Sequence, residues 1–407
     1  MLESPWLIGA LWIGLALLAS MISIRIAISV ALIEIIVGAV ASNLIPCVGS
    51  LAGVQAGLVT TPWIDFLAGF GSILLTFLAG AEIEPETLQK HWKPALTIGF
   101  MSFVMPFLGA AAPAYWLLHW SVQASLIAGT ALSTTSVAVV YTVMLETGLN
   151  RKDFGKLILA SCFVTDLGTV LALGIVFANY NWWLVLFLVV SAALMPFAPR
   201  LAQRFLRRYE GQVSEPEIKL LLLMLFLLGG LAARANSEAV LPAYILGLVL
   251  AGVLRHHKET VYHIRVAVFA LLTPFYFLKA GALISAGALR QGALVILLLL
   301  AVKVAAKFIG VYPTAKLFRM DHRVSMYTTL LMSTGLTFGT ISALFGLSHG
   351  IVDQGQYSAL VAAVIGSAVV PTLIANAFFL PRNLLSAGVN PADQAPPATT
   401  NPERKGP

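Results

Sequence analysis

The sequence predicts an all-α protein that crosses a membrane many times. Of its 407 residues, 59% are hydrophobic and only 11% are charged, whereas about a quarter of the residues in a soluble domain are charged. Apolar runs recur along the whole chain, and many approach the ~20 residues that a helix needs to span a bilayer. A helix satisfies its backbone hydrogen bonds internally, so it is the structure expected for such runs in lipid.

We expect thirteen transmembrane helices within a membrane domain of residues 1–380. The second and ninth are the weakest predictions because their apolar runs are short. Residues 381–407 are polar and rich in proline, which predicts a disordered tail. In chain order, the expected helices cover residues 6–24, 26–45, 64–82, 95–118, 122–145, 154–178, 182–198, 217–233, 239–254, 264–283, 291–312, 324–347 and 357–380.

The basic residues divide unequally between the two sides of this arrangement. Of 25 lysines and arginines, Arg234 and Arg290 lie in loops on one side, and Lys279, Lys303 and Lys307 lie inside expected helices. The other 20 lie in loops that follow odd-numbered helices. Cytoplasmic loops carry the excess of basic residues, so we expect an inner (plasma) membrane protein with its N-terminus outside and its C-terminus in the cytoplasm. The net charge of +7 thus reflects topology, and no nucleic-acid surface is expected.

The loops leave little room for chemistry outside the membrane. We find no glycine-rich dinucleotide motif and no histidine–cysteine cluster of the kind that holds a metal, so no cofactor and no resident metal are expected. Cys47 and Cys162 lie far apart in apolar surroundings. The first residues lack the basic region of a signal peptide, so we expect the first apolar run to be retained.

Thirteen helices divide as six, one and six, which indicates an internal repeat. Helices 1–6 and 8–13 are offset by seven, an odd number, so the two halves cross the membrane in opposite senses. Inverted repeats of this kind are typical of secondary transporters. Helices 5 and 12 are partners by this offset, and both contain hydroxyl clusters, in 130-TALSTTSVAVV-140 and 333-STGLTFGTIS-342.

These clusters predict two helices that unwind within the membrane. Hydroxyl side chains can bond freed backbone groups and glycine weakens a helix, so Thr134, Gly335, Thr337 and Gly339 are the expected unwound positions. The alternative is that the small residues only allow neighbouring helices to pack closely.

Asp166, in 161-SCFVTDLGTVLALG-174, is a carboxylate in the middle of an apolar helix. Cys162 and Thr169 lie on its face of the helix, flanked by Thr165 and Ser161. A charge at this depth costs ~2.5–3.5 kcal/mol on insertion scales and usually faces a cavity. A buried carboxylate can hold either a proton or a small cation, and that competition is the minimum chemistry for antiport. The alternative is a structural aspartate paired with a buried lysine.

Three lysines are expected within the membrane. Lys303 and Lys307 are four residues apart and share one helix face, so at least one should face Asp166 or unwound backbone. Lys307 could instead extend toward the cytoplasmic surface. Lys279 could cap a helix end or pair with Glu34, and the sequence does not choose between these.

Taken together, the residues resemble those of bacterial cation:proton antiporters of the sodium/proton exchanger superfamily, closest to the monovalent cation:proton antiporter-2 type. The resemblance covers about residues 6–380. Its segments are weak singly and specific in this order. They are 31-ALIEIIVGAV-40, 79-AGAEIEPETL-88, 129-GTALSTTSVAVV-140, 163-FVTDLG-168, 274-PFYFLKAGALI-284 and 306-AKFIG-310.

The resemblance implies a core domain that moves against a dimerisation domain, with elevator-like alternating access in a homodimer. The core domain would include about 95–178 and 291–380, and the dimerisation domain about 6–82 and 182–283. Two unwound helices would cross beside the ion-binding aspartate, which Asp166 matches, and Lys307 matches the lysine of the family's K-x-x-G pattern. The expected ion- and proton-binding residues are Asp166, Thr165, Thr135, Ser136, Ser133 and Cys162, with Lys307 and Lys303 as supporting charges.

The chain departs from the family pattern at Thr165. Electrogenic members have a carboxylate at that position, so a single titrating carboxylate predicts electroneutral 1:1 exchange of Na⁺, or alternatively K⁺, for H⁺. The acidic partner of the family lysine is missing, so a structural role is the expectation for Lys307. Many relatives append a nucleotide-binding domain that the residues given do not include, so we expect either that the protein works without it or that the chain is part of a longer protein. Two other functions stay open: a sodium-coupled organic-anion symporter and, less favoured, a lipid-modifying membrane enzyme.

Overall fold

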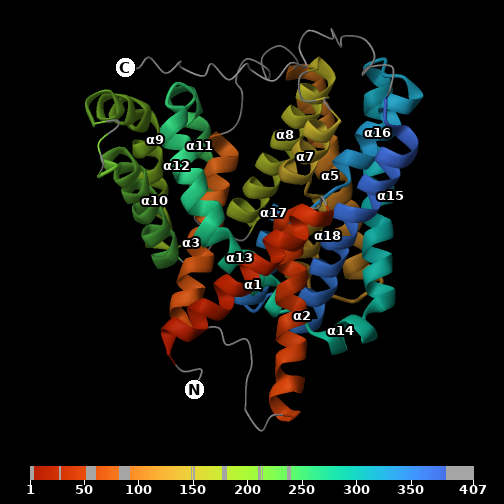
Figure 1. Ribbon diagram of the computed structural model, residues 1–407. Coiled ribbons are helices and arrows are strands. Elements are labelled where there is room, and N and C mark those ends of the chain that lie inside the picture. Colours follow the sequence, from red (N-terminus) through yellow and green to blue (C-terminus); the bar gives the residue numbers. More distant parts are fainter. Residues whose placement is uncertain are drawn as a thin grey trace, which may run out of the picture.

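The computed structural model describes residues 4–26, 29–51, 61–81, 92–147, 149, 152–176, 181–209, 212, 214–235 and 240–381. Within these ranges the chain is helical and contains no strand, which confirms the all-α prediction (Figure 1). The expected tail lies outside the described residues, apart from Pro381.

The helices follow one another with short connections. In chain order they are α1 (Pro5–Ile26), α2 (Val30–Leu51), α3 (Pro62–Ala81), α5 (Trp92–Trp116), α6 (Val122–Ser133), α7 (Val137–Glu146), α8 (Asp153–Val176), α9 (Trp182–Tyr209), α10 (Pro216–Arg234), α11 (Val240–Leu254), α12 (Lys258–Ala267), the π-helix η2 (Val268–Leu272), α13 (Thr273–Ala282), α14 (Ala286–Gln291), α15 (Ala293–Leu317), α16 (His322–Met332), α17 (Thr337–Ser348), α18 (Gln354–Ile374) and the π-helix η3 (Ala375–Phe379).

Ten helical stretches in the described residues are long and apolar enough to cross a membrane. Three shorter apolar helices, Val30–Leu44, Val122–Ser133 and Val240–Leu254, fall in the second, fifth and ninth expected segments. Every expected segment therefore contains an apolar helix. The number of crossings itself stays a prediction.

The helix bounds differ most from the prediction at α9. This helix was expected to end at residue 198, with a basic loop after it, but it continues to Tyr209. Arg200, Arg204, Arg207 and Arg208 lie in these added turns and are exposed. The apolar pattern stops where the helix leaves the hydrocarbon, whereas the helix itself continues because arginine is a good helix former and suits a C-terminal end.

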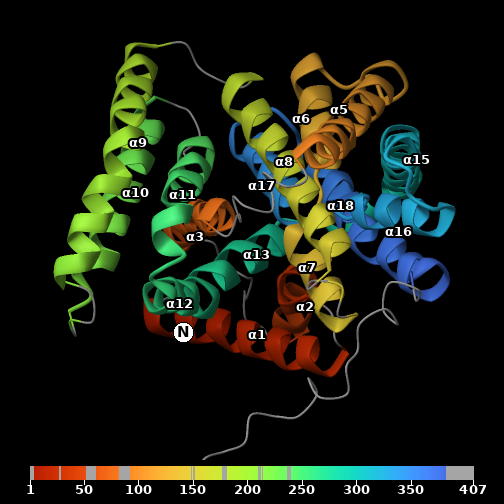
Figure 2. The same ribbon diagram turned by 90° about the horizontal axis from the view of Figure 1, so that it is seen from above.

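The helices form two groups with a shared middle (Figure 2). On one side are α9, α10, α11 and α3. On the other are α5, α6, α15, α16 and α18, while α8, α13 and α17 lie between them. This arrangement is compatible with the expected dimerisation and core domains, which stay a prediction.

Glycines bring α2 and α13 together at reciprocal positions. A Cβ atom on Gly38 of α2 would overlap the backbone oxygen of Leu278 in α13, and one on Gly281 of α13 would overlap that of Ile35 in α2. Backbones can approach this closely only where side chains are absent.

The crossing of α3 with α11 repeats this arrangement. A Cβ on Gly247 would overlap the backbone oxygen of Phe77, and one on Gly80 would overlap that of Tyr244. Along the chain, Gly281 follows Gly80 by the same interval as Leu278 follows Phe77. These matched contacts support the predicted repeat.

The second group shows the same offset where α5 packs on α15. A Cβ on Gly109 would lie 2.8 Å from the Cβ of Ala306, and one on Gly310 would lie 2.9 Å from the Cγ of Met105. The interval from Gly109 to Gly310, and from Met105 to Ala306, is again the one that separates Gly80 from Gly281. A twofold relation between the halves requires such exchanged contacts, so they too support the repeat.

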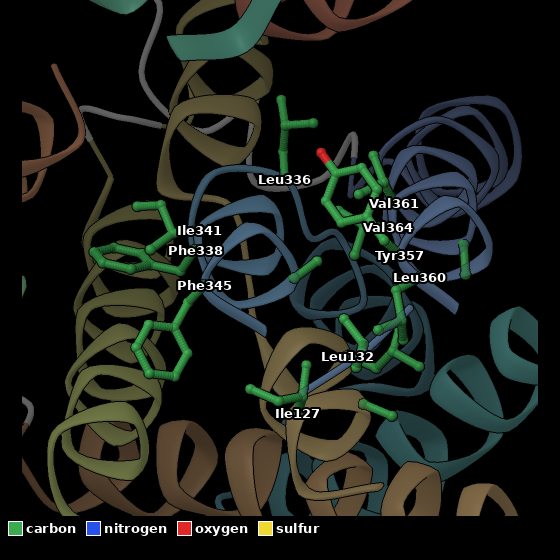
Figure 3. Packing of buried hydrophobic residues seen from close by; sticks show 14 of the residues in the cluster. Ile127, Leu132, Leu336, Phe338, Ile341, Phe345, Tyr357, Leu360, Val361 and Val364 are labelled. Carbon is green, nitrogen blue, oxygen red and sulfur yellow. The ribbon is translucent and has the colours of Figure 1, made fainter. Parts of the chain in front are cut away.

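Apolar side chains fix the α17–α18 region to α6 (Figure 3). The cluster draws on α6, on the connection between α16 and α17, on α17 and on α18. Its labelled members are Ile127, Leu132, Leu336, Phe338, Ile341, Phe345, Tyr357, Leu360, Val361 and Val364. This packing buries the site described next.

Candidate functional site

Two transmembrane segments are interrupted at their middles. Helix α6 ends at Ser133 and α7 begins at Val137, while α16 ends at Met332 and α17 begins at Thr337. The connecting residues, 134–136 and 333–336, are not helical. The two breaks meet, because the Ser136 amide donates a hydrogen bond to the Thr334 carbonyl at 3.0 Å.

Hydroxyl groups on the helical side of each break bond back to their own helix. In the first break, Ser133 Oγ donates to the Thr130 carbonyl at 2.9 Å and Thr134 Oγ1 to that of Ala131 at 3.0 Å. In the second, Ser333 and Thr334 donate likewise to Thr329 and Leu331, both at 2.7 Å. These hydroxyls stabilise the helix ends that the breaks create.

Thr135 connects the two breaks. Its Oγ1 donates to the Met332 carbonyl at the end of α16, at 2.9 Å. The next residue, Ser136, accepts a bond from the Val139 amide at 3.4 Å and so caps the first turn of α7. The cluster expected to bind an ion thus also maintains the backbone.

Thr337 and Gly339 were expected in the unwound segment but lie in the first turn of α17. The helix resumes early because Gly339 serves close packing. A Cβ there would lie 2.9 Å from the Ala131 carbonyl oxygen and 3.0 Å from Thr134 Oγ1. Gly335 is in the break, as expected.

Lys307 binds the first break from α15. Its ammonium is fully buried and donates to Ser102 Oγ at 2.7 Å, the Ser133 carbonyl at 2.8 Å and Thr135 Oγ1 at 3.0 Å. The alternative in which Lys307 extends to the membrane surface is therefore wrong. Three bonds use the full donor capacity of an ammonium group, and one of them neutralises the carbonyl end of α6.

Asp166 lies in α8 with 1% of its surface exposed. Its Oδ1 is buried and has no hydrogen-bond partner among the described residues. The ion pairs found in that part of the chain are His263–Glu215 and Lys279–Asp65, and neither includes it. The geometry therefore does not support the alternative of a structural aspartate paired with a buried lysine. A buried carboxylate oxygen that lacks a partner is costly unless a proton or cation occupies it.

The turn of α8 that carries Asp166 is held on two sides. Thr165 Oγ1 lies 3.2 Å from the Gly99 carbonyl oxygen of α5 and 3.0 Å from that of Ser161, so its hydroxyl bonds to backbone. Cys162 Sγ lies 3.7 Å from the sulfur of Met332, the last residue of α16 before the break. Asp166 is thereby placed beside the crossing of the two broken helices.

Lys303, one turn before Lys307, is also fully buried, but no described residue hydrogen-bonds its Nζ. This Nζ occupies the space beside Gly335, where a Cβ atom would overlap it. Both lysines therefore face the unwound backbone, one at each break.

The third lysine has a partner that the sequence did not suggest. Lys279 Nζ lies 2.8 Å from the Asp65 carboxylate of α3, so its ion-pair partner is Asp65 and not Glu34. Lys279 also lies in the last turn of α13, at a helix end as the other alternative expected. The pair lines a cavity of about 350 Å³ between α3, α10, α13 and α17. Glu34, the other alternative partner, is buried in α2.

Three contributors to this site were missed in the sequence. Ser102 receives the Lys307 bond, Met332 contacts Cys162, and Tyr244 OH donates to the Phe163 carbonyl of α8 at 3.1 Å. Of these, only Ser102 could have been found from the sequence, because the internal repeat makes it the residue of the first half that is equivalent to Lys303. The expected residues that do gather at the crossing are Asp166, Cys162, Ser133, Thr134, Thr135, Ser136, Gly335, Lys303 and Lys307.

Comparison with known proteins gives a consistent result. The family profile described as "Sodium/hydrogen exchanger, transmembrane" matches residues 13–380. The probable Na⁺/H⁺ antiporter 3 of Methanocaldococcus jannaschii is 23% identical over 82% of this chain and 91% of its own length. A Na⁺/H⁺ antiporter of Enterococcus hirae is 24% identical over 81% of this chain and 90% of its own length.

A solved structure shows the same fold. The sodium proton antiporter MjNhaP1 from Methanocaldococcus jannaschii superposes with a TM-score of 0.62, covering 90% of this chain and 95% of that one at 14% identity. These are transporters, which rejects the membrane-enzyme alternative. The resemblance drawn from the motifs is confirmed, and the chain belongs to the sodium/hydrogen exchanger family of multi-pass membrane proteins.

Proposed function

We propose that this protein exchanges Na⁺ for H⁺ at Asp166 by alternating access. The observation that carries the proposal is the buried Asp166 Oδ1, which has no hydrogen-bond partner among the described residues although it lies beside two broken helices. Occupation by a proton and by a cation are the two ways to compensate such a group, and they exclude each other. Sodium/proton exchange by relatives supports the same reaction.

The exchange is proposed to be electroneutral, with one ion for one proton. Thr165 stands where a second carboxylate would add a second titrating charge, and its hydroxyl bonds to backbone instead. The other expected ligands are Thr135, Ser136, Ser133 and Cys162. Hydroxyl and carbonyl oxygens serve Na⁺, K⁺ and Li⁺ alike, and selectivity among these ions depends on the size of the cavity. Na⁺ is proposed because relatives are named Na⁺/H⁺ antiporters, and K⁺ is the alternative ion.

The moving parts are proposed to be two domains, each of which contains one of the helix groups of Figure 2. The core would include about 95–178 and 291–380 and move against a dimerisation domain of about 6–82 and 182–283, in an elevator-like manner within a homodimer of the plasma membrane. With the N-terminus outside, the 350 Å³ cavity beside the Lys279–Asp65 pair opens on the outer side. It offers a route from that side to the gap between the groups.

The test is cation-driven pH change in proteoliposomes that contain a trapped pH dye. Wild type, Asp166→Asn and Asp153→Asn are compared with Na⁺, K⁺ and Li⁺; Asp153 is an exposed carboxylate on the same helix and serves as the matched control. We expect Asp153→Asn to exchange normally. Asp166→Asn should lose exchange by more than ~100-fold, because an uncharged amide cannot alternate between binding a proton and binding a cation. Exchange that survives Asp166→Asn would reject the site.

Two further measurements on the same vesicles separate the finer statements. Turnover should not respond to a clamped membrane potential, and a response would reject the 1:1 stoichiometry while leaving antiport intact. Uptake of a labelled dicarboxylate that follows a Na⁺ gradient would favour the organic-anion symporter instead.

A further inference from the structure

The two buried lysines of α15 differ in how their charge is met. Lys307 has three acceptors, one of which is the carbonyl end of a half-helix. Lys303 is as deeply buried, yet its Nζ has no hydrogen-bond partner among the described residues. The bonds to the first break account for Lys307. No such contact accounts for Lys303, so its position calls for another explanation.

The internal repeat shows what stands at the equivalent place. Ser102 in α5 precedes Lys303 by the same interval that relates Gly109 to Gly310 in the same two helices. Ser102 Oγ lies 3.4 Å from Thr135 Oγ1 at the first break. Thr135 precedes Gly335 by almost the same interval. Two small hydroxyl side chains at one break thus correspond to a lysine and a glycine at the other.

Within each pair the two side chains compensate for each other in size: two small hydroxyl side chains meet at the first break, and a large lysine meets a glycine at the second. A Cβ on Gly335 would overlap Lys303 Nζ and lie 2.8 Å from Thr134 Oγ1. The glycine is therefore needed because the ammonium occupies its side-chain space. Where the first break has a neutral contact, the second has a lysine, in the site proposed above to bind cations.

We propose that Lys303 sets the cation affinity of the exchange site: its charge beside Gly335 weakens cation binding at Asp166. The proposal rests on the proposed function of Asp166. A transport site has to release its ion on the far side, so binding that is too tight slows turnover. The protonated ammonium of Lys303, at the second break beside Gly335, would repel a cation bound at the crossing and speed its release.

The charge is tested by neutral replacement. Methionine at position 303 keeps the aliphatic chain but ends one atom short of Nζ, so it removes the charge with little change in packing. We expect Lys303→Met to lower the KM for Na⁺ on the order of tenfold, because the repulsion between two like charges is removed, and to lower kcat as well. The matched control is Lys316→Met on the exposed end of the same helix. It should leave both constants unchanged.

The steric part is tested through Gly335. We expect Gly335→Ala to reduce exchange at least tenfold, because its Cβ and the ammonium compete for one space. Adding Lys303→Met should restore part of the activity, since the shorter side chain vacates that space while the 2.8 Å contact of the Cβ with Thr134 Oγ1 remains. Damage to the fold alone would raise KM or lower the protein yield and would not be rescued by a second substitution.

Each other outcome counts against the proposal. A KM for Lys303→Met that is within twofold of wild type, or higher, overturns it, and so does a double variant no better than Gly335→Ala. If Lys303→Met does not fold, Lys303→Gln is measured in its place, and failure of both to fold makes the residue structural and ends the proposal. Loss of exchange in Asp166→Asn combined with an unchanged KM in Lys303→Met rejects this inference only, whereas exchange that persists in Asp166→Asn rejects the proposed function.

Discussion

Replacing Lys307 by glutamine should destabilise the protein more than it alters ion coupling. The lysine ammonium makes three buried bonds, to Ser102 Oγ, the Ser133 carbonyl and Thr135 Oγ1. Glutamine ends about one atom short of Nζ, and Ser102 and Thr135, whose hydroxyl oxygens are 3.4 Å apart, can bond each other instead. The Ser133 carbonyl, at the end of α6, is the acceptor left without a donor.

The expected magnitude follows from these contacts. Bonds to a charged group contribute ~1.5–3 kcal/mol each, so the three sum to about 5–9 kcal/mol. Removing a buried ammonium also removes its desolvation cost, which offsets several kcal/mol. We therefore expect a net loss of about 2–4 kcal/mol, with the unmet carbonyl as the main cause. A chain of this size should then unfold roughly 2–8 °C lower, at about 1–2 °C per kcal/mol by extension of the size scaling.

The assay is thermal unfolding of the purified protein in detergent, with exchange measured on the same preparation. Lys316→Gln, exposed near the end of α15, is the control and should shift the unfolding temperature by less than about 1 °C. The number of ions exchanged per proton should stay the same in Lys307→Gln. An unfolding temperature equal to that of the control, together with lost exchange, would refute the structural role and assign Lys307 to ion coupling.

Two more predictions concern the packing that holds the site. Gly38→Ala should lower the unfolding temperature by several degrees, because its Cβ would overlap rigid backbone of α13. The control is Gly14→Ala, where a Cβ would have nothing within 4 Å, and it should leave the unfolding temperature unchanged or slightly higher. Equal shifts of the two variants in a thermal melt would contradict the close crossing of α2 and α13. Thr165→Ser should keep exchange, whereas Thr165→Asp should reduce the yield of folded protein at neutral pH, because a carboxylate would face the Gly99 carbonyl that the hydroxyl now donates to. Thr165→Asp protein that is stable and exchanges in a potential-dependent way would show that this position is free to take a second charge.

The helices, and the polar residues that gather at the crossing, were predictable because both follow from the cost of polarity in lipid. A buried carboxylate such as Asp166 and two hydroxyl clusters stand out in an apolar sequence. The sequence pattern also placed the breaks within a few residues. It did not locate the resumption at Thr337, because Gly339 serves contact with α6 there and does not loosen the helix.

Partnerships across helices were much less predictable. The Asp65–Lys279 pair joins residues from opposite halves of the chain, and neither residue carries a local pattern that points to the other. The positions of Ser133 and Gly335 at the crossing decide which of the two lysines finds hydrogen-bond acceptors, and the sequence does not give those positions. The length of α9 was underestimated because hydropathy reports the edge of the hydrocarbon and says nothing of where backbone bonding stops.

The bond between the Ser136 amide and the Thr334 carbonyl has a mechanical consequence. Pulling the two interrupted segments apart would strand both groups in a medium without water, which is costly. The four half-helices should therefore move as one rigid body during turnover, and any surface along which domains slide should lie outside it. The distance between a spectroscopic label on α7 and one on α17 should then stay constant while the ion is carried across the membrane.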